Sequence, residues 1–207
     1  MAPTYKLYYF DTPGRGEKIR YIFAYAKQDF EDIRITKDLW PEFKKKTPYG
    51  QVPVLEIDGK PIAQSFSICR YLARKFNLDG KNELEALECD SMVETLGDLI
   101  QKSKKYLTET DPKQKEIEKR KLFEEDVPFF FKKFEDIVSK NGGYTVGSQI
   151  TWSDFHFANI LPEFEKSSPG LLKSYPALNS LIDKVSNLPS IKEWKEKSAQ
   201  LKKYYVP

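Results

Sequence analysis

The pattern of hydrophobic residues changes once along the chain, near residue 78, and this change limits the folds that the sequence can adopt. Up to residue 77, short apolar runs of strand length alternate with stretches of helical periodicity. Beyond residue 81 only helical periodicity follows. We therefore expect an α/β domain over residues 1–77 and an all-α helical-bundle domain over residues 82–207.

The first domain is expected to contain four strands. Two apolar runs with a helical pattern between them predict a βαβ unit. Further along, Asp58-Gly59 separates two short apolar runs, which is typical of a type I′ hairpin, and a helix follows it. The order β-α-β and then β-β-α is the thioredoxin-like arrangement. The expected elements are strands at 5–10, 30–35, 54–57 and 60–63 and helices at 17–26 and 64–76.

The second domain shows one complete helix-start signal. Thr151 is a candidate N-cap, Asp154 can reach back to its amide, and Ile150 with Phe155 can form a hydrophobic staple. This signal serves folding and carries no chemistry. The expected helices span 84–107, 116–140, 152–164, 175–188 and 191–201.

Composition excludes several classes of function. The 207 residues include one histidine, which argues against a metal site with several histidine ligands and against a Ser-His-Asp triad. A net charge of +3 does not favour nucleic acid, and no apolar run approaches the roughly 18 residues of a membrane span. Cys69 and Cys89 match no zinc or redox motif and are expected to be buried, reduced thiols. We expect a cytoplasmic protein that binds neither nucleic acid nor membranes.

Two local features could bind a ligand. Pro53 follows a glycine-containing turn, and a cis Val52–Pro53 bond would leave the Val52 amide and carbonyl free to pair with an extended peptide. The alternative is that Pro53 only begins a strand. Gln64 and Ser65 precede a helix, whose N-terminal amides suit a carboxylate, although Ser65 could serve only as a cap.

Seven segments, in this order and spacing, resemble the sigma class of glutathione transferases. The resemblance covers nearly the whole chain and rests on residues 5–10, 14–20, 38–41, 48–55, 64–68, 93–98 and 146–155. It implies a homodimer that takes glutathione as co-substrate together with a small hydrophobic electrophile, and no permanently bound cofactor.

The resemblance also implies roles for individual residues. Tyr9 matches the catalytic tyrosine of the family. Asp98 matches an acidic residue that reaches the glutathione of the other subunit. The remaining glutathione-contacting positions match Arg15, Trp40, Lys44, Gln51, Val52, Gln64 and Ser65.

The electrophile pocket departs from the family pattern. By position it would involve Phe10, Gly14, Arg15, Ile100, Lys105 and His156. An aromatic residue is usual at the position of Lys105 and a tyrosine at that of His156, which argues against prostaglandin isomerase activity and favours a more polar electrophile. His156 could equally be a half-buried helix residue without a chemical role. One interpretation places the tail, 203–207, over this pocket.

The same resemblance bears on metal binding. Related vertebrate prostaglandin D synthases carry acidic residues at the positions of Glu94, Gly97 and Asp98, and bind a divalent ion there. Gly97 interrupts that cluster in this chain, so no metal site is expected.

The chemistry expected of Tyr9 follows from the pKa of a thiol, which is about 8.5, so that few molecules are thiolate at neutral pH. A phenol that donates a hydrogen bond to sulfur stabilises the anion. No cysteine precedes Cys69 and no serine precedes Ser65, so the first strand and the turn after it offer only Tyr8 or Tyr9, or less plausibly Thr12, and the family alignment selects Tyr9. The leading hypothesis is a glutathione S-transferase of detoxification. The alternatives are a glutathione-dependent prostaglandin isomerase and a non-catalytic crystallin-like or ligand-binding protein.

Overall fold

The computed structural model describes residues 3–201, and the tail over 203–207 lies outside the described residues. Its contacts divide the chain into two compact units. The first unit contains the residues up to Leu78 together with those from Ser186 onward, and the second unit is Asp79–Val185. The last helix, α9 (Pro189–Gln200), therefore groups by its contacts with the α/β part, whereas the expected helical domain, 82–207, includes it.

The first unit is built on a four-stranded mixed sheet in the order β2-β1-β3-β4. β1 runs parallel to β2 and antiparallel to β3, and β3 pairs with β4 in the predicted hairpin. Asp58 and Gly59 both have positive φ, at 49° and 83°, as a type I′ turn requires. The expected thioredoxin-like arrangement is thus confirmed. The strands are β1 (Tyr5–Phe10), β2 (Glu31–Ile35), β3 (Val54–Ile57) and β4 (Lys60–Ala63).

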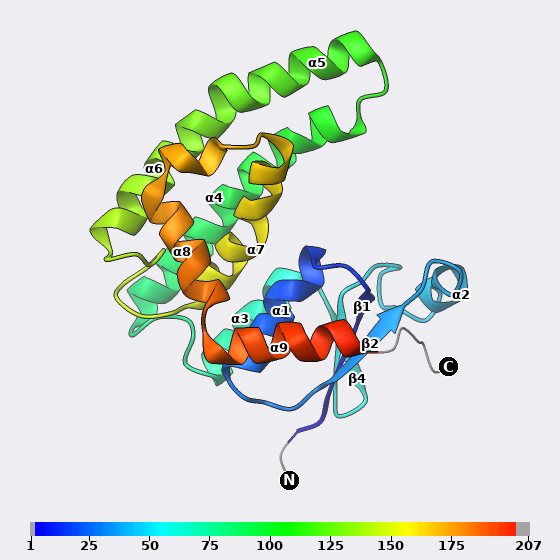
Figure 1. The fold of residues 1–207 in the computed structure, drawn as a ribbon. Coiled ribbons are helices and arrows are strands. Elements are labelled where there is room, and N and C mark those ends of the chain that lie inside the picture. The colour runs from blue at the N-terminus through cyan, green and yellow to red at the C-terminus, as the bar shows by residue number, and fades with distance from the viewer. Residues whose placement is uncertain (1–2, 202–207) are drawn as a thin grey trace. The chain divides into compact units, whose positions relative to one another are not determined.

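Four helices belong to this unit: α1 (Gly14–Tyr25), α2 (Trp40–Lys44), α3 (Ser65–Lys75) and α9. α1 packs against both α3 and α9, and the pairing of α1 with α9 is visible in Figure 1. α1 begins before the expected residue 17, because the Glu17 amide already donates to the Pro13 carbonyl. α2 is not among the helices expected from the sequence, since five residues that include a proline show no helical periodicity.

The second unit is all helical. The expected helix 116–140 is found as three consecutive elements, because a π-helical turn interrupts it just before Pro128, whose nitrogen cannot donate a hydrogen bond. Within residues 3–201 no helix is long and apolar enough to span a membrane. Figure 1 labels α4 (Glu83–Thr108), α5 (Pro112–Lys121), α6 (Val127–Lys140), α7 (Trp152–Ser167) and α8 (Pro176–Ser186). The unit also contains the π turn (Leu122–Asp126) and a 3-10 turn (Leu171–Ser174).

The predicted capping box at the start of α7 is present. The Thr151 amide donates to Asp154 Oδ2 at 2.7 Å. The other carboxylate oxygen accepts from the amide and the hydroxyl of Thr145, both at 2.8 Å. All three side chains are buried, so this carboxylate fixes the loop before α7 as well as the helix itself.

Candidate active site

The register of the sheet gathers the candidate residues of the first unit at one edge. Tyr8 pairs with Val54, and Val54 pairs with Ala63, so the residues just beyond these three meet one another. Phe10 pairs with Ile35, which brings the chain leading to α2 to the same edge. Six of the expected glutathione-binding residues of the first unit lie within a strand end or within five residues of one: Tyr9, Arg15, Trp40, Val52, Gln64 and Ser65.

The hydroxyl of Tyr9 lies at the start of α1. Its oxygen accepts a hydrogen bond of 2.9 Å from the backbone amide of Arg15, and the Tyr9 side chain is buried. Because the oxygen is the acceptor here, the phenolic hydrogen can be donated to a further group. Tyr8 points to the opposite face of the sheet, where its hydroxyl donates to Glu56 Oε2 at 3.2 Å and its ring stacks on Phe43.

Two glycines let the Tyr9 ring lie directly against the first turn of α1. A Cβ atom on Gly14 would stand 2.6 Å from Tyr9 Oη, and one on Gly16 would overlap Tyr9 Cδ1. Gly14 also has φ of +35°, which side chains rarely adopt. The loop between β1 and α1 is therefore shaped around this ring.

A buried arginine holds that loop. Arg20 is almost fully buried, and its guanidinium donates to the carbonyls of Phe10 at 3.2 Å and Thr12 at 3.1 Å. It also pairs with Asp32 at 3.0 Å and with Glu17 at 3.1 Å, so its charge is neutralised. Neither Arg20 nor Asp32 is among the residues expected from the sequence, although a charge at an apolar position of the helical pattern was a usable signal.

The ionic network continues to α9 through Arg34. Its guanidinium pairs with Asp32 at 2.9 Å and with Asp11 at 2.6 Å, and it donates to Ser198 Oγ at 2.6 Å. The indole of Trp194, also on α9, donates to Glu17 Oε1 at 3.2 Å. α9 therefore helps to fix the loop that presents the Arg15 amide to Tyr9.

At the same edge, the residue before Pro53 and the start of α3 offer backbone groups that could bind a ligand. The Val52–Pro53 bond is cis, and the Val52 backbone forms no hydrogen bond with another described residue. Gln64 has φ of +75°, and its side chain does not cap α3. The first turn of α3 contains no acidic residue, so the partial positive charge at this helix end suits an anion such as a carboxylate.

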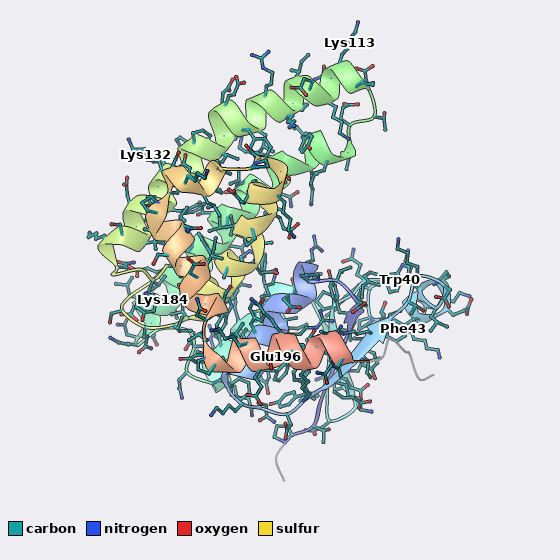
Figure 2. All side chains as sticks on the ribbon, viewed as in Figure 1. Trp40, Phe43, Lys113, Lys132, Lys184 and Glu196 are labelled. Atoms are coloured by element: carbon teal, nitrogen blue, oxygen red, sulfur yellow. The ribbon has the colours of Figure 1, made fainter. Side chains whose placement is uncertain are left out.

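α2 adds an aromatic and a basic side chain. Trp40 meets Phe10 edge to face with ring centroids 5.2 Å apart, and Figure 2 shows Trp40 and Phe43 on α2. The stem of Lys44 packs against Gly50, since a Cβ there would lie 3.2 Å from Lys44 Cε. Gln51 follows that turn and is exposed.

The other candidate residues belong to the second unit. Asp98 and Lys105 are exposed on α4, while His156 on α7 is only 1% exposed. Ile100 lines an apolar cavity of about 170 Å³, to which Lys105 and His156 do not contribute. Its other apolar lining residues are Tyr106, Leu107, Leu122, Phe123, Ile160 and Phe164.

No group of three or more His, Cys, Asp or Glu residues in the described part of the chain is arranged to hold a metal ion. Cys69 and Cys89 are buried and form no disulfide. Burial raises the pKa of the Cys69 thiol to about 12 and that of Cys89 to about 11, so neither is a nucleophile at neutral pH.

Comparison with known proteins agrees with this geometry. Residues 5–74 match the family model for the glutathione S-transferase N-terminal domain, and residues 97–198 match that for the C-terminal domain. Glutathione S-transferase S1 of Drosophila melanogaster is 39% identical over 94% of this chain and 78% of its own length.

Two solved structures are also similar. Prostaglandin synthase D of Nilaparvata lugens is 44% identical with a TM-score of 0.87, over 94% of this chain and 98% of that one. Monomeric Na-GST-3, a glutathione S-transferase of Necator americanus, is 35% identical with a TM-score of 0.85, over 98% and 100%. With both domain models matched and these relatives aligned over nearly its full length, the chain belongs to the glutathione S-transferase family.

Proposed function

We propose that this family member is a sigma-class enzyme that conjugates glutathione to small hydrophobic electrophiles, in the cytoplasm and as part of detoxification. The phenol of Tyr9 donates a hydrogen bond to the sulfur of glutathione, which stabilises the thiolate and so lowers the pKa of the thiol. The resulting thiolate attacks an electrophilic carbon of the second substrate, and the sulfur–carbon bond forms as the leaving group departs or the double bond is saturated. Two buried cysteines without a disulfide are consistent with a reducing compartment.

The hydrogen bond from the Arg15 amide to Tyr9 Oη carries this proposal. It occupies the oxygen as an acceptor, and it draws electron density from the O–H bond, so that the phenol becomes a better donor. A hydrogen bond to a charged group contributes about 1.5–3 kcal/mol. That energy corresponds to a thiol pKa one to two units below about 8.5.

The same edge of the sheet suits the remainder of the tripeptide. The free Val52 amide and carbonyl can pair with an extended cysteinyl backbone, and the bare first turn of α3, at Gln64 and Ser65, can bind the γ-glutamyl carboxylate. The basic side chains of Arg15 and Lys44 suit the negative charge of glutathione. We propose further contacts from Trp40 and Gln51.

The cavity beside Ile100 supports an apolar electrophile. An apolar cavity of about 150 Å³ can hold a guest the size of benzene, so about 170 Å³ suits one aromatic ring or a short alkyl chain. No metal and no resident cofactor take part in the reaction.

We further propose a homodimer. Asp98 is exposed on α4, and in the homodimer it reaches the γ-glutamyl amine bound by the partner. Since Na-GST-3 is named monomeric, this assignment needs its own measurement. A sedimentation mass near 24 kDa at micromolar concentration would overturn the homodimer.

Conjugation of glutathione to chlorodinitrobenzene tests the mechanism. Tyr9→Phe should lower kcat/KM about 10- to 100-fold, because it removes the donor to sulfur. Tyr8→Phe is the matched control and should stay within about twofold, since that hydroxyl bonds Glu56 on the other face. Wild-type protein that binds glutathione without turnover would refute an enzyme, and an inactive Tyr8→Phe beside an active Tyr9→Phe would refute the choice of tyrosine.

Glutathione-dependent prostaglandin isomerisation is the second candidate. It is favoured by the similarity to prostaglandin synthase D of Nilaparvata lugens, and it is disfavoured by Lys105 and His156, where the family resemblance implies aromatic residues. Incubation with prostaglandin H2 and glutathione distinguishes the two. A D-series product formed faster than the conjugate would favour the isomerase.

A further inference from the structure

Lys18 is a buried ammonium group without an anionic partner. It lies on α1 and is 2% exposed, and its Nζ stands 4.2 Å from the centroid of the Phe66 ring. It forms no hydrogen bond or ion pair with another residue among 3–201. Lysine is almost never this buried unless it is paired, because leaving water costs a charged group several kcal/mol.

The ring under this cation belongs to the first turn of α3. Phe66 follows Ser65, the first residue of that helix, whose orphan amides give the helix end a partial positive charge. No acidic residue of that turn compensates this charge. The Lys18 ammonium therefore lies over a side chain of the turn that carries this partial positive charge, and no acidic residue of that turn neutralises either.

The other groups near Lys18 do not supply that anion. Burial lowers the pKa of Lys18 to about 8. The charge of Arg15 also lowers this pKa, whereas the Cys69 thiol raises it. Cys69 is itself neutral at physiological pH, since burial raises its pKa to about 12. Lys18 is consequently a cation at pH 7 in surroundings that favour an incoming negative charge.

We propose that Lys18 is a specificity-determining residue for the γ-glutamyl carboxylate of glutathione, adding its charge to the amides at the start of α3. This inference rests on the proposed function, which places that carboxylate at Gln64 and Ser65. Water is largely excluded around Lys18, so its attraction for the carboxylate is weakly screened even without direct contact.

Binding of S-methylglutathione, measured by isothermal titration calorimetry at pH 7, tests Lys18. This probe has no thiol to ionise, so Tyr9 does not complicate the result. Lys18→Met should weaken binding about tenfold, whereas Lys18→Arg, which keeps the charge, should stay within about threefold of wild type. Equal binding by wild type and Lys18→Met overturns the role of Lys18 alone, while a wild-type protein that does not bind the probe refutes the proposed function with it.

Two analogues of the probe identify the carboxylate. One replaces the γ-glutamyl group by 4-aminobutanoyl, which removes its α-carboxylate, and the other converts the glycyl carboxylate to an amide. The effect of Lys18→Met should vanish with the first and persist with the second, and the reverse result overturns the assignment. Wild-type protein gives an independent measurement if Lys18→Met does not fold. The ratio of its affinity for the probe to its affinity for the first analogue should fall from pH 7 to pH 9.5, because Lys18 loses its proton. An unchanged ratio overturns the proposal.

Discussion

Lys18→Met should make the protein more stable at neutral pH. The wild-type fold lowers the pKa of Lys18 from 10.5 to about 8, and a change of this size corresponds to about 3 kcal/mol of unfavourable interaction with the charged form. Methionine removes that charge and keeps most of the buried stem. Loss of the cation–π contact with Phe66 offsets about 0.5–2 kcal/mol, so the net gain is about 1–2.5 kcal/mol.

The gain should disappear as the pH rises. Because the folded-state pKa of Lys18 is lowered, the unfolded chain binds this proton more tightly between pH 8 and about 10.5. Stability of the wild type therefore increases relative to Lys18→Met across that window, and below pH 8 the full difference is present. Urea unfolding of both proteins at one protein concentration, followed by tryptophan fluorescence at pH 7 and pH 10, measures the difference.

Lys132→Met provides the matched control, since Lys132 is exposed on α6, as Figure 2 shows, and its removal changes the net charge equally. Its free energy of unfolding should stay within about 0.5 kcal/mol of wild type at both pH values. Lys18→Met that is less stable than wild type at pH 7, or a difference that does not change with pH, would refute the interpretation of Lys18 as an uncompensated buried cation.

Three further outcomes are expected. The pH at which the rate of conjugation is half-maximal should rise by about one to two units in Tyr9→Phe, because the thiol regains its ordinary pKa; an unchanged pH profile contradicts thiolate stabilisation by Tyr9. Asp154→Ala should lower the free energy of unfolding by about 3 kcal/mol or more, since it leaves the buried amides of Thr145 and Thr151 without their acceptor, and a urea midpoint close to that of wild type would contradict this. Cys69 and Cys89 should react with iodoacetamide only after unfolding, which mass spectrometry of native and urea-treated protein can show; rapid labelling of either in the native protein would contradict their burial.

Most of the fold could be predicted because its elements have strong periodic signals. The strand at 5–10, the hairpin around Asp58-Gly59 and the capping box of α7 occur where the sequence indicates them. α2 and the π turn before Pro128 could not be predicted in this way. One is too short to show a period, and the other differs from an α-helix only in its hydrogen bonds, which leave little trace in the order of residues.

Part of the candidate site could also be derived from the strand order. Once β1, β3 and β4 are adjacent, their register alone brings Tyr9, Val52 and Gln64 to one edge. The side to which each tyrosine points follows from strand alternation. Which of them receives a hydrogen bond at its hydroxyl from the Arg15 amide does not follow, because the position of that amide depends on how the loop folds.

The buried charges show why the remainder could not be predicted. Arg20 and Arg34 are neutralised by Asp32, and Arg34 also bonds Ser198, which lies 164 residues away along the chain. Such a network exists only after the loop, β2 and α9 have come together, so no local window of sequence contains it. Lys18 lies on the same helix as Arg20, and both are buried, but no carboxylate pairs with Lys18 in the described part of the chain. Lys18 departs from the general rule that a buried charge is paired with an opposite charge. Departures from such rules are found where a protein binds its ligand.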